Sequence, residues 1–260
     1  MKFYVINLKR SPKRWAHIQQ QFAQFGLIAT RVEAVDGRKL TKHDLSLYRT
    51  GRYATLADDE IACFLSHRTC WQQVADGDDP YACIFEDDVH ISKHFPDFLQ
   101  TKIWTECSGL LSIEQFHPVI RAKPRPVVKK SNYCVYRCVE SNPGAAGYIL
   151  SKTIAKQLLQ DSDPFYHLVD SFLFSPRRII AARFNSYQLA PAVCLQGRKN
   201  KEFSANHYVH PTSIGSKRHL SIGAARANRG FKYILERLWI YWRFYAGLIH
   251  YKKIPIEFEE

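Results

Sequence analysis

The sequence lacks any long hydrophobic run. None of its apolar stretches approaches the roughly 20 residues that a membrane-spanning helix needs. The apolar run from Phe3 to Leu8 is too short for a secretion signal, and it contains Asn7. We therefore expect a protein that does not cross a membrane and that works in the cytoplasm.

Several common motifs are also missing. No Gly-x-Gly-x-x-Gly follows the first predicted strand, and no glycine-rich loop ends in Gly-Lys-Ser or Gly-Lys-Thr. These absences disfavour a dinucleotide oxidoreductase and a P-loop enzyme. The seven cysteines are odd in number and show no Cys-x-x-Cys spacing. We expect them to be reduced and to pack as small core residues, and we expect no zinc site.

Acidic residues are scarce relative to basic ones. The chain has 37 Lys and Arg against 24 Asp and Glu, which gives a formal net charge of +13. The excess gathers in residues 121–130 and from Lys217 to Lys253, where nine basic residues accompany a single acid, Glu236. Such a surface indicates an anionic partner: nucleic acid, acidic lipid or a phosphorylated substrate.

The length of 260 residues and the hydrophobic content of 46% allow a large folded domain. The first ninety residues predict strands at 2–7, 28–33 and 81–85 that alternate with helices at 12–25 and 58–75. This β-α-β-α-β order is typical of a mostly parallel, Rossmann-type α/β sheet that binds nucleotides.

The second half is less regular. Residues 126–139 predict two strands around a turn, and residues 151–159 predict a helix. A short helix containing Asp170 and a strand over residues 187–195 follow. No internal repeat or low-complexity linker divides the chain, so we expect one domain over residues 1–216 with a C-terminal appendage.

The appendage, residues 217–260, is basic and aromatic. Leu235, Leu238, Trp242 and Tyr245 recur at helical spacing among Lys and Arg. A basic helix rich in Trp and Tyr is typical of an element that lies on an anionic membrane surface. The alternative is a terminal helix that packs its aromatic face on the domain.

Three consecutive carboxylates, Glu86, Asp87 and Asp88, follow the predicted strand at 81–85. Carboxyl ends of parallel strands are where open α/β sheets place their sites, and Mg²⁺ is held by one or two carboxylates together with substrate phosphates. Alternation along the strand predicts that Glu86 and Asp88 face one way and Asp87 the other. The alternative is a solvated acidic turn.

Five segments of the chain carry a family resemblance. They are Val5–Ser11 followed by Arg14, Ala34–Gly37, Glu60–His67, Phe85–Val89, and Gly144–Ser151 followed by Asp170. In this order and spacing they resemble glycosyltransferase family 25, the lipooligosaccharide sugar-transferase family. The resemblance implies a GT-A-like fold, a UDP-sugar donor (commonly UDP-galactose), and transfer with inversion onto a lipooligosaccharide acceptor.

The resemblance also implies roles for the acidic residues. Glu86 and Asp88 are expected to hold a divalent cation, Mn²⁺ or Mg²⁺, against the departing diphosphate. Asp87 is expected to orient a donor-sugar hydroxyl or the following helix. Asp170 is the candidate base that takes the acceptor proton, since inversion by one displacement needs a carboxylate there. The alternative for Asp170 is an ion pair with Arg177 or Arg178.

Eight residues are expected at the donor: Asn7, Leu8, Arg10, Arg14, Asp36, His67, Gly144 and Gly147. Those after the first strand would bind uridine and diphosphate next to a helix N-terminus. Asp36 would accept a hydrogen bond from the nucleoside or simply form a turn. His67 would contact the donor or cap the carboxylates, or be an ordinary half-buried histidine. The two glycines would admit backbone close to the sugar or permit a turn.

Two other functions remain open at this point. The basic, aromatic tail could belong to a non-enzymatic protein that binds nucleic acid, although clustered carboxylates repel phosphates unless a cation intervenes. A relative that kept the fold and lost catalysis is also compatible with the sequence. We favour the enzyme and expect no nucleic-acid partner.

Overall fold

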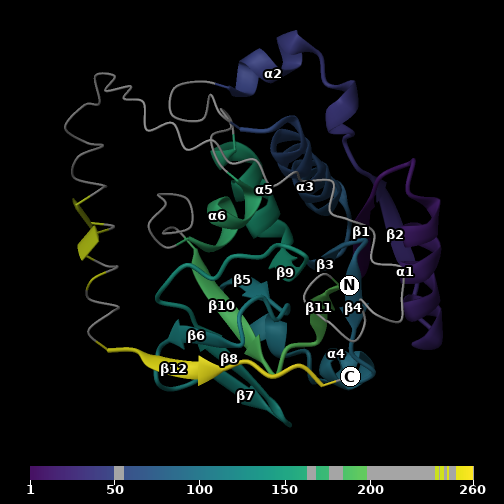
Figure 1. The fold of residues 1–260 in the computed structure, drawn as a ribbon. Helices are drawn as coiled ribbons and strands as arrows, with labels where there is room; N and C mark the ends of the chain where they lie inside the picture. Colours follow the sequence, from purple (N-terminus) through teal and green to yellow (C-terminus); the bar gives the residue numbers. More distant parts are fainter. Residues whose placement is uncertain are drawn as a thin grey trace.

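An eight-stranded sheet forms the centre of the computed structural model, which describes residues 1–49, 56–162, 168–175, 184–197 and 250–259 and five single positions between 238 and 245 (Figure 1). The strand order is β2-β1-β3-β9-β5-β10-β8-β7. The strands are β1 (Lys2–Asn7), β2 (Ala29–Glu33), β3 (Tyr81–Glu86), β5 (Gly109–Ser112), β7 (Val128–Lys130), β8 (Tyr133–Arg137), β9 (Gly147–Ser151) and β10 (Asn185–Ala190).

Most of the central strands point in one direction. Strand β1 pairs in parallel with β2 and with β3, and β5 pairs in parallel with β10. Strand β9 runs antiparallel between β3 and β5, so β5 and β10 have the direction of β3. The predicted α/β class with largely parallel central strands is therefore confirmed, in an arrangement compatible with a GT-A-like fold.

Helices cover both faces of this sheet. On one face lie α3 (Asp58–Asp76), α5 (Lys152–Asp161) and α6 (Val169–Phe174), and on the other lie α1 (Pro12–Gln24) and α4 (Phe95–Thr101). Residues of β1 alternate between the two cores: Tyr4 and Ile6 pack with α3, whereas Phe3 and Val5 pack with α1. Burial on both sides explains why these strands read as continuous apolar runs.

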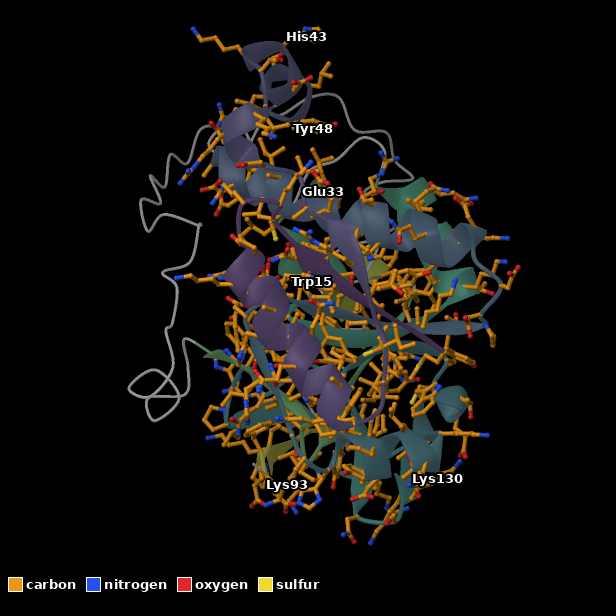
Figure 2. All side chains as sticks on the ribbon, turned by 90° about the vertical axis from the view of Figure 1, so that its right-hand side faces the viewer. Trp15, Glu33, His43, Tyr48, Lys93 and Lys130 are labelled. Carbon is orange, nitrogen blue, oxygen red and sulfur yellow. The ribbon has the colours of Figure 1, made fainter. Side chains whose placement is uncertain are left out.

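Local sequence signals set the limits of α1. Pro12 occupies its first turn, where a missing N–H is harmless. Gly26 adopts a φ of 66° and donates its N–H to the carbonyl of Ala23, a left-handed ending that favours glycine. In Figure 2 this helix faces the viewer and carries Trp15, over whose ring the Arg31 guanidinium lies 5.6 Å from the centroid.

The loop after β2 contains two short helices, η1 (Gly37–Lys39) and α2 (Lys42–Tyr48). Thr41 and Asp44 cap α2 reciprocally: the Thr41 hydroxyl accepts the Asp44 N–H, and the Asp44 carboxylate accepts the Thr41 N–H. The Ser66 hydroxyl of α3 accepts the N–H of Val35 at 2.9 Å. This bond ties the end of β2 to α3.

The single strand predicted over residues 187–195 is wrong. Strand β10 ends at Ala190, and a separate strand, β11 (Cys194–Gln196), pairs antiparallel with β4 (Val89–Ile91). Pro191, which has no N–H to donate, follows directly after β10 and interrupts the ladder. The break carries the chain from the main sheet to the strand that follows the acidic triplet.

The end of the chain differs from the predicted helical appendage. Strand β12 (Lys252–Pro255) pairs antiparallel with β6 (Val119–Ala122), and Ile254 and Ile256 are buried in a small core beside it. This strand runs along the lower edge of the molecule in Figure 1. The 3-10 turn η3 (Ile103–Glu106) completes the regular elements. The domain limit predicted at residue 216 lies outside the described residues.

Five residues between 238 and 245 are described, and each has helical backbone: Leu238, Trp239, Tyr241, Trp242 and Tyr245. Their side chains are exposed, with exposed fractions from 40% for Tyr241 to 69% for Trp242. Among the described residues, no helix combines the length and apolarity required to cross a bilayer.

Candidate active site

A cavity of about 250 Å³ opens where β1 and β3 end side by side. Its lining comes from the ends of these strands, from α1, α3 and α6, and from β11. Polar and charged side chains that line it include Arg14, His67, Glu86, Asp88, Asp170 and Gln196. The cavity therefore lies at the carboxyl edge of the parallel strands, as predicted for the acidic triplet.

The three carboxylates of the triplet face in two directions. Glu86 and Asp88 both accept hydrogen bonds from the side-chain amide of Gln196, at 3.3 Å to each residue. Asp87 turns the other way and accepts bonds from Asn7 Nδ2 at 2.6 Å and Arg14 Nη1 at 2.9 Å. The hydrogen bonds separate Asp87 from Glu86 and Asp88 as expected, although Asp87 and Asp88 form a turn between β3 and β4 and do not continue the strand.

Burial and repulsion make the triplet electrostatically costly. Burial, with a further contribution from the Glu86 charge, raises the pKa of Asp88 to about 7. Burial also raises the pKa of Asp87, although Arg14 and the bond from Asn7 oppose that rise. A divalent cation between Glu86 and Asp88 would remove their repulsion. The two carboxylates are the hard oxygen ligands that Mg²⁺ and Mn²⁺ prefer, so these residues fit such a cation.

A second group of ligand atoms overlaps with this pair. Cys63 Sγ, a ring nitrogen of His67 and a Glu86 oxygen lie within 4.8 Å of one another. Cys63 and His67 are four residues apart on α3 and therefore share one helix face. Burial, with the Glu86 charge next in size, raises the pKa of the Cys63 thiol well above its ordinary value. Because a neutral thiol is a weak ligand for hard cations, Glu86 and Asp88 fit the predicted ion better.

Five of the predicted donor residues line the cavity, as does the candidate base; the five are Leu8, Arg10, Arg14, His67 and Gly144. Leu8 and Arg10 follow β1, His67 projects from α3, and Gly144 precedes β9. Asp170, near the start of α6, reaches the cavity from the side of α3. Its alternative partners, Arg177 and Arg178, lie outside the described residues.

Asn7 and Asp36 are not among the residues that line the cavity, and their side chains bond to other residues of the protein. Asn7 is buried and donates to Asp87 and to the carbonyl of Ser11. Asp36 caps η1 by accepting the N–H of Arg38 at 3.1 Å, and it pairs with Arg10 Nε at 2.8 Å. The bond from Arg10 holds the pKa of Asp36 below its usual range. In the structure Asp36 therefore forms a turn, which is the alternative stated for it above. Its ion pair also positions Arg10.

Glycine is needed at the two predicted positions, Gly144 and Gly147, for different physical reasons. A Cβ at Gly147 would lie 2.2 Å from Cys194 Sγ, so glycine is needed there for packing between β9 and β11. Gly144 has a φ of 109° and lies where a Cβ would come within 2.8 Å of Glu114 Oε2. Gly144 is the glycine of the cavity wall, and Gly147 is buried in β9.

The sequence reasoning missed Gln196, which joins Glu86 to Asp88. Gln196 is the last residue of β11, and it reaches Glu86 only because β11 pairs with β4, a contact that no local pattern indicates. It also missed the contacts behind His67. Tyr148 Oη lies 2.9 Å from His67 Nδ1 and 2.9 Å from Trp71 Nε1, and no short-range pattern connects β9 with α3.

Comparison with known proteins identifies the family of the chain. The model of glycosyltransferase family 25 (LPS biosynthesis protein) matches residues 1–173. The lipooligosaccharide biosynthesis protein lic2B of Haemophilus influenzae is 32% identical over 205 residues, which cover 74% of this chain and 75% of that protein.

Two lacto-N-neotetraose biosynthesis glycosyltransferases are also similar. LgtE of Neisseria gonorrhoeae is 26% identical over 210 residues, which cover 75% of this chain and 74% of LgtE. LgtB of Neisseria meningitidis serogroup B is 28% identical over 211 residues, covering 75% of each chain. With the family model matching about two thirds of its length, the chain belongs to glycosyltransferase family 25.

Proposed function

We propose that this protein is an inverting glycosyltransferase that moves a hexose, galactose in our assignment, from a UDP-sugar to a lipooligosaccharide acceptor. The observation that carries the proposal is the cavity at the ends of β1 and β3. It combines a carboxylate pair suited to a cation, Glu86 and Asp88, with Arg14 and the separate carboxylate of Asp170. The names of the relatives support lipooligosaccharide as the acceptor.

The leaving-group side of the reaction is assigned to the residues around the triplet. A divalent cation on Glu86 and Asp88 would supply positive charge to the diphosphate oxygens as the glycosidic bond breaks. Arg14, which pairs with Asp87, lines the same cavity and brings its positive charge there. Asn7 fixes Asp87 from the opposite side, so Asn7 and Asp87 are positioning residues for Arg14. Leu8 and Arg10 would contact the nucleotide.

Asp170 is assigned as the base. As the acceptor hydroxyl oxygen attacks the anomeric carbon, its proton passes to a carboxylate oxygen of Asp170, and the diphosphate leaves from the far side in the same displacement. Asp170 belongs to α6, whereas Glu86 and Asp88 follow β3, so base and leaving-group charges come from different elements around one cavity.

The proposal is tested by incubating the protein with a panel of UDP-sugars and truncated lipooligosaccharide, with and without Mn²⁺. We expect Mn²⁺-dependent transfer that is fastest with UDP-galactose, and a product of inverted anomeric configuration. Another preferred sugar would refute the donor assignment alone. No transfer and no donor hydrolysis, in a protein that binds UDP, would favour an inactive relative. Tight binding of nucleic acid without either reaction would favour the non-enzymatic alternative.

We also propose peripheral contact of this protein with the anionic inner face of the cytoplasmic membrane. The support is the exposed set of Leu238 and the aromatic residues Trp239, Tyr241, Trp242 and Tyr245 within a basic segment. Aromatic side chains partition to the headgroup region, and each nearby Lys or Arg adds attraction to anionic lipid.

Substitution of Trp239 and Trp242 together by Ala should weaken sedimentation with anionic vesicles about tenfold or more, since it removes two interfacial anchors. Truncation of the whole appendage would be a poor test, because it would also remove β12 from its pairing with β6. Zwitterionic vesicles serve as the control and should bind weakly. Equal binding of the double variant and the unaltered protein to anionic vesicles would refute the contact.

A further inference from the structure

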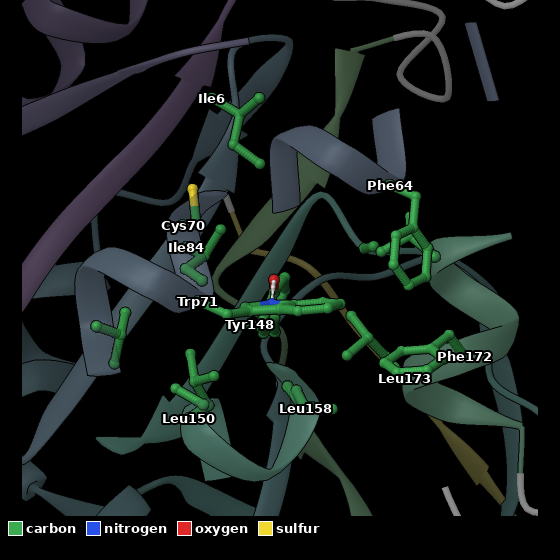
Figure 3. Packing of buried hydrophobic residues seen from close by; sticks show 14 of the residues in the cluster. Ile6, Phe64, Cys70, Trp71, Ile84, Tyr148, Leu150, Leu158, Phe172 and Leu173 are labelled. Carbon is green, nitrogen blue, oxygen red and sulfur yellow. Dashed lines mark hydrogen bonds between the residues drawn. The ribbon is translucent and has the colours of Figure 1, made fainter. Parts of the chain in front are cut away.

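The hydroxyl of Tyr148 lies at the centre of a buried polar chain. Tyr148 belongs to β9, and its side chain is fully buried against α3. Its oxygen lies 2.9 Å from Trp71 Nε1 and 2.9 Å from His67 Nδ1. Figure 3 shows the hydroxyl between the surrounding apolar side chains, with the bond to Trp71 drawn. Because His67 and Trp71 are four residues apart on α3, both reach this one oxygen.

The chemistry of these groups fixes the direction of each bond. An indole nitrogen can only donate, so Trp71 uses a lone pair of the Tyr148 oxygen. The one phenolic hydrogen then needs an acceptor, and among the described residues the partner in reach is His67 Nδ1. The reverse arrangement, with Nδ1–H donating, would leave the phenolic hydrogen buried and unpaired, which is unfavourable. Neutral His67 therefore carries its hydrogen on Nε2.

The Nε2–H group points toward the acidic pair. His67 Nε2 lies 3.4 Å from Glu86 Oε1, and the other Glu86 oxygen accepts the Gln196 amide at 3.3 Å. Glu86 is thus held from both sides, by α3 and by β11. The His67 ring is in turn stacked against the Tyr148 ring, with an interplanar angle of 23°.

We propose that His67 is a positioning residue: Tyr148 holds it in the Nε2–H tautomer, in which it donates to Glu86 and is not a ligand of the cation. This inference rests on the proposed function for the role of Glu86. The competing arrangement is the group of Cys63, His67 and Glu86 described above. Ligation through His67 Nε2 would require the hydrogen on Nδ1, and so would leave the Tyr148 hydroxyl without an acceptor.

The tautomer can be read directly by two-bond ¹H–¹⁵N correlation spectra of the histidine rings. The His67 signal is assigned by its absence in His67→Gln. We expect the pattern of an Nε2–H tautomer in the metal-free protein, unchanged when diamagnetic Mg²⁺ is added. An Nδ1–H pattern without metal, or loss of the Nε2 proton on adding Mg²⁺, would overturn the proposal. The metal-free spectrum is independent of whether transfer occurs.

Paired variants then test the donor role. A glutamine amide reaches the place of Nε2 and an asparagine amide that of Nδ1, so His67→Gln retains the donor to Glu86 and His67→Asn loses it. Outer hydrogen bonds of this kind change metal affinity by about 10- to 100-fold. We expect Mn²⁺ affinity, measured by the electron paramagnetic resonance signal of free Mn²⁺, to fall by about that factor in His67→Asn and by less than about threefold in His67→Gln.

Equal losses of affinity in the two variants would indicate a ligand and refute the positioning role. Tyr148→Phe and Trp71→Phe provide a second comparison, since Trp71→Phe removes only the bond that the hydroxyl accepts, whereas Tyr148→Phe removes the hydroxyl and both of its bonds. Only Tyr148→Phe should change the tautomer pattern of His67. If the unaltered protein binds no Mn²⁺, the cation of the proposed function is refuted together with the role of Glu86, whereas the spectra alone decide the tautomer.

Discussion

Replacing Asp88 by Ala is expected to lower the rate of sugar transfer by about 10³-fold, the loss typical for removal of a group that stabilises developing charge. Asp88 shares the Gln196 amide with Glu86, so its removal leaves one carboxylate where two would hold the cation. The rate is measured with saturating UDP-sugar and acceptor over a range of Mn²⁺ concentrations. Most of the loss should persist at the highest concentration.

The matched control is Asp97→Ala, which removes the same side chain from the exposed surface of α4, where 67% of it is accessible. Its transfer rate should stay within about twofold of the unaltered protein, as expected for an exposed surface substitution. A normal rate in Asp88→Ala would remove Asp88 from the mechanism, and with it the central part of the proposed function.

The raised pKa of Asp88 adds a pH dependence to this prediction. Glu86, Asp87, Arg14 and Gln196 surround its carboxyl group, and burial together with Glu86 raises its pKa to about 7. A bound proton competes with the cation, so Mn²⁺ affinity should rise with pH up to about 7 and then level off. The metal-free folded state binds this proton more tightly than the unfolded chain. As the pH rises from about 4 to about 7, the free energy of unfolding of the metal-free protein should therefore decrease. The Asp88→Ala variant should lack this decrease.

Replacing Asp170 by Asn should reduce transfer by about 10²- to 10⁴-fold, the usual contribution of a positioned base. Asparagine keeps the shape of the side chain and cannot take a proton. Because Asp170 belongs to α6 and is assigned neither to the cation nor to the donor, the variant should bind UDP-sugar and Mn²⁺ as the unaltered protein does. Calorimetric titration with UDP, beside the rate measurement, separates the two effects.

Asp76→Asn, at the exposed end of α3, is the corresponding control and should leave transfer unchanged. Weakened UDP binding in Asp170→Asn would place Asp170 at the donor and refute its role as base. Full activity would instead direct the search for the base to other residues of the cavity.

The elements that could be predicted are those whose signals are local. Helix α1 shows its limits through Pro12 and Gly26, and β3 shows itself as a short apolar run that ends at Glu86. The sequence also indicated that Glu86 and Asp88 share a side; both accept bonds from Gln196, although the strand on which that argument relied ends at Glu86 and a turn follows. Those arguments require no knowledge of which elements meet in space.

What could not be predicted depends on contacts between distant elements. Gln196 meets Glu86 only because the chain breaks after Ala190 and β11 pairs with β4. Gly147 is predicted at the donor only because it is a glycine. The structure needs glycine at this position because a Cβ would collide with the sulfur of Cys194 in β11. Strand β12 was predicted as helix because its pairing partner, β6, lies about 130 positions earlier in the chain. Periodicity carries no information about such partners.

The pairing of β12 with β6 means that the chain returns to the domain after the segment between Gly197 and His250, whose start is bonded to Asp88. A tail fixed only at its beginning would let the enzyme tumble freely above whatever its aromatic residues touch. A doubly attached segment restricts that tumbling. Adsorption through Trp239 and Trp242, as proposed, would then hold the domain near the lipid from both ends of this segment.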